Sequence, residues 1–336
     1  MFTNAELLPT LLRVLPQTPT VSTVVYDGEP EKSVLENIRA VRDSIKLMSI
    51  DELRTNGRAL PTDSLDARAP QKEDVALIMY TSGSTGNPKG VVHKHSNLMA
   101  SVGGVCTLLG HHFVAGDTFL AYLPLAHVLE FIVELTFFYI GLPIGYGRVK
   151  TLTDASVRNC KGDINTFRPS ILVGVPAVWE NIRKSILAKV QAGGTIKKNI
   201  FDGAYALKKN NVPVLAQIAD AVVFSGVRAA TGGRLRLAMS GSAALSRETQ
   251  EFLSHALVTV LQGESCIIRQ RAYLIYSHRV LGYGMTESCG MCAILPPELK
   301  QCGVVGLPVP SVEIKLLDVP NAGYFVSNQQ GEVCIR

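Results

Sequence analysis

The stretch from Tyr80 to Gly90 constrains this chain more than any other. It has the sequence Y-T-S-G-S-T-G-N-P-K-G and follows an apolar run over residues 75–80, which predicts a buried strand. Glycines let backbone N–H groups approach an anion, hydroxyl groups donate hydrogen bonds to it, and a lysine adds a positive charge. A strand that opens into such a loop predicts a phosphate-binding site. The alternative is a solvated turn rich in glycine and serine.

This loop differs from the common nucleotide-triphosphate loop, G-x-x-x-x-G-K-[ST]. Counting from Gly83, Pro88 stands where the second glycine is required, and Gly90 stands where serine or threonine follows the lysine. The sequence therefore predicts a phosphate loop of another lineage. Its candidate phosphate-binding residues are Thr81, Ser82, Gly83, Ser84, Thr85, Gly86 and Lys89.

Composition excludes several other classes of protein. The chain has 336 residues, 47% of them hydrophobic and 18% charged, which is typical of a globular protein with a sizeable core. The net charge of +5 comes from dispersed basic residues, so solvated helix faces are favoured over a nucleic-acid surface. The seven cysteines show no metal-ligand spacing, because Cys289 and Cys292 form a C-x-x-C without a second pair.

No segment predicts secretion or a membrane span. The first residues lack the basic start and apolar core of a signal peptide, and we expect reduced thiols in a protein that faces the cytosol. The most membrane-like stretch, Val128 to Tyr146, contains Glu130 and Glu134. Two carboxylates in so short a run predict a buried or interfacial helix.

The loop at 80–90 resembles the signature of the adenylate-forming (AMP-binding) superfamily, which includes acyl-CoA synthetases, luciferases and peptide-synthetase adenylation domains. The resemblance implies an α/β fold: the large N-terminal domain of these enzymes, with stacked mixed sheets and helices.

Residues 123–130, L-P-L-A-H-V-L-E, resemble the second motif in its long-chain acyl-CoA synthetase form. There His127 stands beside the acyl carboxylate and the adenylate; the alternative is a hydrogen-bonded core histidine. Glu130 resembles a residue typical of that branch. A functional role and a purely structural role are both open for it.

The segment that ends in G-V-P-A-V-W at Trp179 resembles the one that lines the acyl tunnel of fatty-acyl-CoA synthetases. The resemblance implies that Trp179, the only tryptophan, gates that substrate tunnel. The alternative is a plain core aromatic residue, because tryptophan is commonly buried.

Two later motifs complete the resemblance. Ser240 to Leu245 resembles a turn whose backbone lies against the adenine, although Ala244 replaces the usual proline. Residues 282–288 match G-Y-G-x-T-E, in which the tyrosine stacks on adenine, Thr286 contacts the α-phosphate and Glu287 holds Mg²⁺, a cation that prefers oxygen ligands. The nucleotide-binding residues so implied are Gly241, Ser242, Ala243, Gly282, Tyr283 and Gly284, and the implied catalytic residues are His127, Thr286 and Glu287.

Nineteen residues, Gly263 to Leu281, match nothing in the family. They separate an expected strand, Ala256 to Gln262, from the motif at Gly282. Codons for both ends of this insert can carry splice-site consensus sequences, so we hypothesise a retained intron. Sequencing the transcript tests this: the hypothesis is wrong if every mRNA contains these codons. If these residues are translated, an inserted segment of this length would hold the motif that begins at Gly282 less firmly in place.

The order of these motifs and elements along the chain indicates two regions. Residues 1–70 indicate the remnant of an upstream α/β subdomain and a linker, with a helix from Glu6 to Val14, a strand from Val21 to Tyr26 and a helix from Pro30 to about Lys46. Residues 71–336 indicate the AMP-binding core. The sequence stops after G-E-V-C-I-R, before the family's T-G-D aspartate and its small C-terminal domain, so we expect an incomplete fragment.

The resemblance implies a long-chain fatty acid–CoA ligase that uses ATP, Mg²⁺ and CoA as co-substrate, acting through an acyl-adenylate. It also implies possible peripheral association with the cytosolic face of an intracellular membrane, such as endoplasmic reticulum or lipid droplet, or a cytoplasmic location, and no nucleic-acid partner. Two alternatives stay open. One is a catalytically inactive fragment that at most binds nucleotide, and the other is a ligase for a different carboxylic acid.

Overall fold

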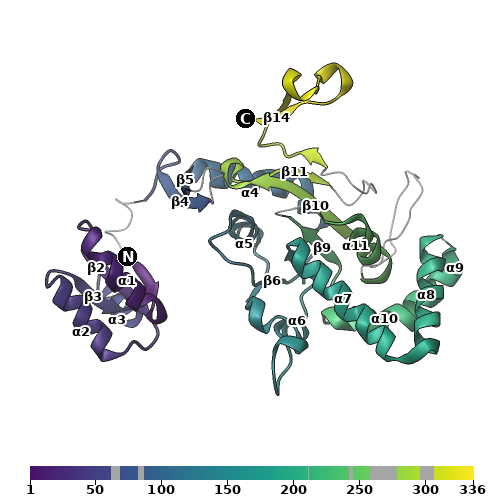
Figure 1. Ribbon diagram of the computed structural model, residues 1–336, viewed down its shortest axis with the longest axis horizontal. Coiled ribbons are helices and arrows are strands. Elements are labelled where there is room, and N and C mark those ends of the chain that lie inside the picture. The colour runs from purple at the N-terminus through teal and green to yellow at the C-terminus, as the bar shows by residue number, and fades with distance from the viewer. Residues whose placement is uncertain (62–68, 82–86, 211, 242–244, 258–277, 296–305) are drawn as a thin grey trace. The chain divides into compact units, whose positions relative to one another are not determined.

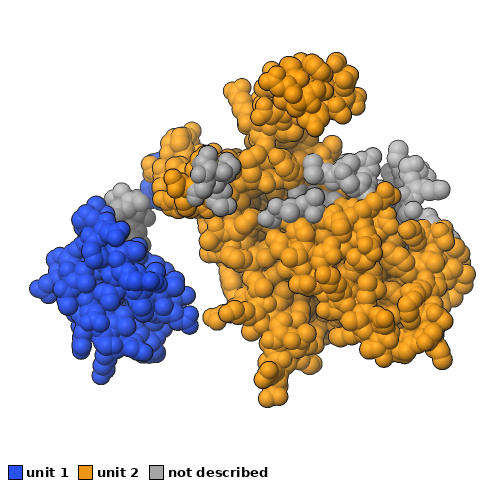
Figure 2. All heavy atoms as spheres, viewed as in Figure 1, with its two compact units in different colours: residues 1–71 blue, residues 72–336 orange. Residues whose placement is uncertain are grey.

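The computed structural model describes residues 1–61, 69–81, 87–210, 212–241, 245–257, 278–295 and 306–336. These residues form two compact units, Met1–Gln71 and Lys72–Arg336, which Figure 2 colours separately.

The first unit is a small parallel α/β layer. Its three strands, β1 (Phe2–Asn4), β2 (Thr23–Asp27) and β3 (Lys46–Ser49), pair in chain order, and its helices are α1 (Leu8–Val14), α2 (Lys32–Val41) and α3 (Ile50–Arg58). The predicted first helix and first strand are confirmed. The predicted helix to Lys46 is wrong at its end. It stops at Val41, because Lys46–Ser49 pairs with β2 and so becomes a strand.

The second unit is built on a seven-stranded sheet in the order β12-β11-β10-β9-β8-β6-β7. The strands from β7 to β10 run parallel, whereas β11 and β12 are antiparallel to their neighbours (Figure 1). Their bounds are β6 (Phe119–Ala121), β7 (Ile144–Tyr146), β8 (Ile171–Gly174), β9 (Leu237–Ser240), β10 (His278–Met285), β11 (Gly290–Leu295) and β12 (Leu307–Pro308).

Helices cover both faces of this sheet. They are α4 (His95–Leu109), α5 (Val128–Ile140), α6 (Asp163–Phe167), α7 (Pro176–Ala192), α8 (Gly194–Lys209), α9 (Pro213–Ala219), α10 (Ser225–Arg228) and α11 (Arg247–Phe252), with a π-helical turn η8 (Asp220–Phe224) between α9 and α10. Alternate strand residues point to opposite faces. Leu172 therefore joins the core formed with α7 and α8, while Ile171 and Val173 join the core formed with α4 and α5. Continuous apolar strands are typical of a parallel sheet covered on both sides. The sheet and helices agree with the predicted α/β fold.

The predicted buried helix is α5. It is 13 residues long, and both of its glutamates are buried. Among the described residues, a different helical stretch, Val214–Thr231, is long and apolar enough to cross a membrane when length and composition alone are considered. Only 22% of that stretch is buried.

The predicted strand from Ala256 to Gln262 is wrong at its start. Ala256 and Leu257 end a π-helical segment, Leu253–Leu257, and bury their side chains in the core beside α7. The place beside β9 is instead taken by the backbone of His278–Leu281, which pairs with Leu237–Ser240. These four residues belong to the insert and run directly into Gly282, so one uninterrupted strand β10 forms. The rest of the insert lies outside the described residues.

Candidate functional site

A hairpin of β4 (Val75–Thr81) and β5 (Lys89–Lys94) holds the two ends of the phosphate loop. The antiparallel pairing sets Thr81 opposite Lys89, so the ends of the loop lie side by side. Ser82, Gly83, Ser84, Thr85 and Gly86 lie outside the described residues. The Lys89 side chain is exposed, as expected for a group that meets an anion. Gly90 is required here, because an added Cβ would lie 2.9 Å from Ile78.

A second hairpin carries the G-Y-G-x-T-E motif. Strands β10 and β11 are antiparallel, and the 3-10 turn η11 (Thr286–Ser288) joins them. The Met285 N–H donates to Ser288 Oγ at 3.1 Å, and Ser288 Oγ lies 3.0 Å from the Gly290 carbonyl oxygen. Cys289 closes the turn in the left-handed region, with φ of 56°. The turn is thus fixed by its own hydrogen bonds, and it presents Glu287 as an exposed carboxylate.

Helix α4, which directly follows the first hairpin, ties the two hairpins together. The Ser101 hydroxyl of α4 donates to the Cys289 carbonyl at 2.5 Å, across 188 residues of sequence. His93, at the end of β5, is buried, and burial lowers its pKa while the nearby Glu287 charge acts in the opposite direction. His93 Nε2 has no hydrogen-bond partner among the described residues.

The segments of His127 and Gly241 also meet. His127 is the N-cap of α5, and its Nδ1 accepts the Leu129 N–H at 3.2 Å. Its side chain is exposed, which excludes the alternative of a core histidine. Gly241 donates its N–H to the Gly174 carbonyl at 3.2 Å, and a Cβ on Gly241 would lie 3.0 Å from Leu129. The turn after β9 therefore lies against the first turn of α5. Ser242 and Ala243 lie outside the described residues.

One apolar cluster holds these motifs together. We call it the junction cluster; its buried members are Met79, Leu98, Val128, Ile132 and Cys289. Met79 is two residues before Thr81, Val128 directly follows His127, and Cys289 is two residues after Glu287. The strand that leads into the loop at 80–90, the first turn of α5 after His127 and the turn that carries Glu287 therefore contribute to the same packed cluster. A close-packed cluster transmits small displacements, so these groups are positioned as a unit.

A cleft of about 440 Å³ opens beside Glu287. Strand β5, helix α4, the η11 turn and the strand β14 (Glu332–Ile335) all contribute to its lining. Its polar lining residues are His93, Asn97, Ser101, Glu287, Ser288, Ser311 and Arg336. Of these lining residues, the sequence motifs indicated only Glu287. His93 and Asn97 belong to the polar run H-K-H-S-N at residues 93–97, but no local pattern there indicates that they lie beside Glu287.

Tyr283, Gly284 and Trp179 complete the predicted set. Tyr283 and Gly284 lie on β10 at a shift in its pairing with β11, and Tyr283 is 37% exposed. Gly282 lies on the same strand.

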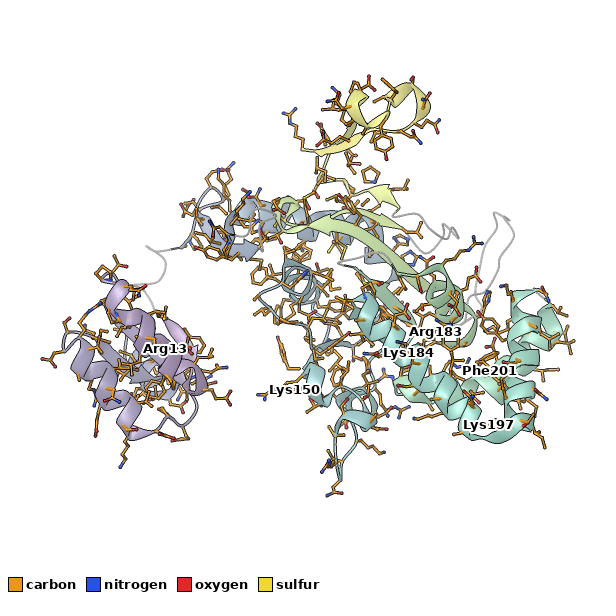
Figure 3. The ribbon with its side chains drawn as sticks, viewed as in Figure 1. Arg13, Lys150, Arg183, Lys184, Lys197 and Phe201 are labelled. Atoms are coloured by element: carbon orange, nitrogen blue, oxygen red, sulfur yellow. The ribbon has the colours of Figure 1, made fainter. Side chains whose placement is uncertain are left out.

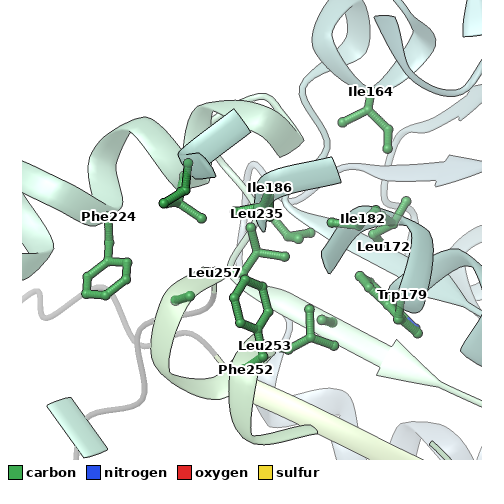
Figure 4. Close-up of a cluster of buried hydrophobic side chains, with 14 of the residues drawn as sticks. Ile164, Leu172, Trp179, Ile182, Ile186, Phe224, Leu235, Phe252, Leu253 and Leu257 are labelled. Carbon is green, nitrogen blue, oxygen red and sulfur yellow. The ribbon is translucent and has the colours of Figure 1, made fainter. Parts of the chain in front are cut away.

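Trp179 is fully buried in α7, and a Cβ on Gly174 would lie 2.9 Å from its indole (Figure 4). Trp179 does not line the cleft beside Glu287, so its role as a tunnel gate stays a prediction.

The two cysteines of the C-x-x-C pair lie inside the second unit. Cys289 and Cys292 are buried, and burial raises the pKa of the Cys289 thiol to about 11. Among the described residues, no group of three His, Cys, Asp or Glu side chains is arranged to hold a metal ion.

Glu130 is the most strongly perturbed acid near the site. Its side chain is 0% exposed, and neither carboxyl oxygen has a hydrogen-bond partner of normal geometry among the described residues. Burial, together with the charge of Glu134 one turn away, raises the pKa of Glu130 to about 8, although the backbone N–H groups of Tyr122 and Leu123 oppose this. The folded protein therefore holds Glu130 protonated at neutral pH.

We expect Glu130 to make stability fall as pH rises. Between about pH 4.5, where the carboxyl ionises in the unfolded chain, and about pH 8, only the folded state keeps the proton. The free energy of unfolding then decreases by at most about 1.4 kcal/mol per pH unit. Replacing Glu130 by Gln removes this slope. Urea unfolding at several pH values, followed by Trp179 fluorescence, measures it, with the exposed Glu332→Gln as the control. An unchanged slope in Glu130→Gln would contradict the assignment.

The chain is similar to known proteins over its whole length. The family model described as AMP-binding enzyme matches residues 1–336. The chain is 41% identical to Long-chain-fatty-acid–CoA ligase 2 of Schizosaccharomyces pombe and 38% identical to Long-chain-fatty-acid–CoA ligase 1 of Saccharomyces cerevisiae. Each alignment covers 100% of this chain and 47% of the relative, so the chain spans about half the length of these curated relatives.

Solved structures show the same fold. The didomain of carboxylic acid reductase from Segniliparus rugosus in complex with AMP matches with a TM-score of 0.68 at 24% identity, covering 100% of this chain and 41% of that one. A benzoate CoA ligase from Burkholderia xenovorans matches with a TM-score of 0.55 at 20% identity, covering 98% of this chain and 54% of that one.

Proposed function

This chain belongs to the family of AMP-binding enzymes, and from that premise we propose that it forms the nucleotide-binding part of a long-chain fatty acid–CoA ligase. The proposed reaction is the ATP-dependent conversion of a fatty acid into its acyl-CoA through an acyl-adenylate. The observation that carries the proposal is the junction cluster, in which residues next to Thr81, His127 and Glu287 pack together. The names of the relatives with 36–41% identity support a long-chain fatty acid as the substrate.

In the first step, a fatty acid carboxylate oxygen attacks the α-phosphorus of ATP. A new oxygen–phosphorus bond forms, the bond to the β-phosphate oxygen breaks, and pyrophosphate leaves. Thr81 and Lys89, at the ends of the loop, would stabilise the charge that develops on the leaving phosphates. His127 and Thr286 would orient the carboxylate and the α-phosphate for attack.

In the second step, the sulfur of CoA attacks the acyl carbonyl carbon, and AMP leaves. Tyr283 would hold the adenine ring by stacking, since its ring is partly exposed beside Gly284. The backbone near Gly241, where the first turn of α5 leaves no room for a side chain, would form the other wall of the adenine site.

The site suits Mg²⁺ bound together with a nucleotide. Mg²⁺ prefers oxygen ligands and is commonly held by one or two carboxylates plus substrate phosphates. Glu287 supplies one exposed carboxylate, and no all-protein metal cage occurs among the described residues. When bound, the metal would neutralise phosphate charge during the transfer. The Glu287 carboxylate would hold it, with its turn fixed by Ser288 and Ser101.

We also propose peripheral attachment to the cytosolic face of an intracellular membrane. The support is an exposed apolar surface on α9 and η8, formed by Val214, Leu215, Ile218 and Val222. Apolar helical surfaces of this kind bind the interface of a bilayer.

Fatty-acid-dependent exchange of radiolabelled pyrophosphate into ATP tests the catalytic proposal. We expect exchange with a long-chain fatty acid such as palmitate, strict dependence on a divalent cation, and no exchange without the fatty acid. Benzoate at the same concentration is the control for substrate class. Strong exchange with benzoate alone would favour a ligase for another carboxylic acid. Nucleotide binding without exchange would favour an inactive chain.

A further inference from the structure

A second cavity, of about 450 Å³, lies within the helical layer formed by α7, α8, η8 and α10. Its volume falls in the roughly 300–1,000 Å³ range of small-ligand pockets. No residue predicted to bind nucleotide or carboxylate lines it. Its apolar lining includes Ile186, Val190, Ile200, Phe201, Val222 and Val227. We call this cavity the helical-layer pocket.

The helical-layer pocket has a buried end and an open end. Ile186, Val190, Phe201 and Val227 are all less than 9% exposed, whereas Ile200 is 55% exposed and Val222 is 72% exposed. The buried side chains belong to the same core that holds Trp179 (Figure 4). Apolar walls that stay in contact with water favour a ligand that covers them, because burial of apolar surface is favourable in proportion to its area. The shape and lining therefore suit a hydrocarbon chain that enters from solvent.

Charge at the pocket favours an anion. Lys189 and Lys197 line it with exposed side chains, and neither forms an ion pair within 4.0 Å among the described residues. Figure 3 labels Lys197 on the same helix as Phe201. Asp154 also lines the pocket, but its carboxylate oxygens already accept the Gly162 N–H at 2.7 Å and the Asn165 side-chain N–H at 2.6 Å. Two lysines and one carboxylate leave a net positive charge, which attracts a negative group.

We propose that the helical-layer pocket is a second binding site, separate from the nucleotide site, for a single-chain amphiphile with an anionic head. The hydrocarbon chain lies along Ile186, Phe201 and Val227, and the head group lies between Lys189 and Lys197. In a fatty acid–CoA ligase this amphiphile is the free fatty acid, a part of the inference that rests on the proposed function. Binding there does not require ATP or turnover.

A naturally fluorescent fatty acid with a conjugated tetraene, cis-parinaric acid, provides the probe. Its absorption overlaps tryptophan emission, and Trp179, the only tryptophan, lies on α7 together with Ile186 and Lys189. Energy transfer from Trp179 therefore reports probe bound near α7. The titration uses the full chain without ATP, and probe bound per chain is counted by equilibrium dialysis.

Two matched glycine variants test the cavity. Gly226 lines the pocket, and an added Cβ there meets nothing within 4 Å, so Gly226→Phe places its ring in open space. Gly203 is also helical and equally open, but it does not line the pocket. We expect Gly226→Phe to bind one equivalent of probe fewer per chain than the parent, and Gly203→Phe to bind as the parent does. Equal binding by both variants would overturn the proposal.

Charge-reversal variants test the head group and do not depend on filling the cavity. We expect Lys189→Glu combined with Lys197→Glu to weaken probe binding roughly tenfold, since two exposed charge contacts are removed. Lys150→Glu combined with Lys184→Glu is the matched control, because both lysines are exposed and lie outside the pocket (Figure 3). The alcohol made by reducing the probe's carboxyl group should bind the parent roughly tenfold more weakly than the acid does. Binding of acid and alcohol with equal affinity would contradict the anionic head.

The test of the helical-layer pocket by probe binding is independent of the test of the catalytic proposal. Pyrophosphate exchange is measured on the same preparations at saturating palmitate, and we expect the pocket variants to exchange at the parent rate. If the parent shows no exchange but Gly226→Phe still loses one equivalent of probe, the pocket stands and the ligase assignment fails. If exchange is normal and the two glycine variants bind alike, the ligase assignment stands and the pocket is wrong.

Discussion

Replacing Glu287 by Gln will reduce fatty-acid-dependent pyrophosphate exchange by about a hundredfold or more, because losing one preorganised electrostatic contact in an active site typically costs 10²–10³ in rate. Glutamine keeps the shape of the side chain but removes the charge that would hold Mg²⁺. Glu287 is exposed in a turn held by Ser288, so the fold does not depend on its charge. The exposed Glu36→Gln is the control and should exchange normally.

A second measurement on Glu287→Gln tests the geometry without catalysis. The Glu287 charge raises the pKa of His93 against the larger effect of burial. Removing that charge should therefore lower the pKa of His93 further, which NMR titration of the histidine ring protons detects. A fall in exchange of less than tenfold would mean that another group holds the metal. An unchanged His93 pKa would mean that the two hairpins do not meet as described.

Replacing Gly284 by Ala will destabilise the unit 72–336 by about 3 kcal/mol or more, at the upper end of the cost of overpacking. A Cβ at this position would lie 1.7 Å from the Gly290 carbonyl oxygen and 2.9 Å from the Met291 Cα. Both atoms belong to the backbone of β11, so no side chain can rotate away. The strands must separate where their pairing shifts, between Tyr283 and Gly284. Because the η11 turn follows directly, exchange activity should be lost together with stability.

Gly103→Ala is the matched control for this prediction. Gly103 lies on the exposed side of α4, where an added Cβ meets nothing within 4 Å. Alanine in a helix interior is favoured over glycine by about 1 kcal/mol, so this variant should be slightly more stable than the parent. Urea unfolding followed by Trp179 fluorescence reports on the second unit alone, because the only tryptophan lies there. Equal stability of the two alanine variants would refute the close approach of β10 and β11.

Local sequence was sufficient for elements whose signals are local. The first helix and strand were predicted because apolar periodicity and turn residues bound them. The helix after Pro30 was predicted too long, because Lys46–Ser49 is short and becomes a strand only by pairing with β2. The strand at Ala256 was wrong for the same kind of reason. An apolar run packs equally well in a helix, and the place beside β9 is taken by residues of the insert.

The residues of the candidate site divide in the same way, into those with a local sequence signal and those without one. Thr81, Lys89, His127, Gly241, Thr286 and Glu287 were selected by motif. The segments of Thr81, His127, Thr286 and Glu287 contribute side chains to the junction cluster, and Gly241 lies against Leu129 of α5. His93 and Ser101 were missed. A buried histidine with an unpaired nitrogen and a serine that holds a distant carbonyl have no local pattern, since each is defined by a partner far along the chain.

The sequence by itself determined the family and the α/β class. It also predicts phosphate binding by the loop at 80–90, because glycines, hydroxyls and a lysine in a short run act through their own backbone and charge. Only the tertiary structure decided which distant segments meet and which groups are buried. The pinning of the Thr286–Ser288 turn by Ser101, the raised pKa of Glu130 and the helical-layer pocket all depend on burial and on contacts between distant segments. Burial changes the free energy of a charge or an apolar wall, and no residue carries that information alone.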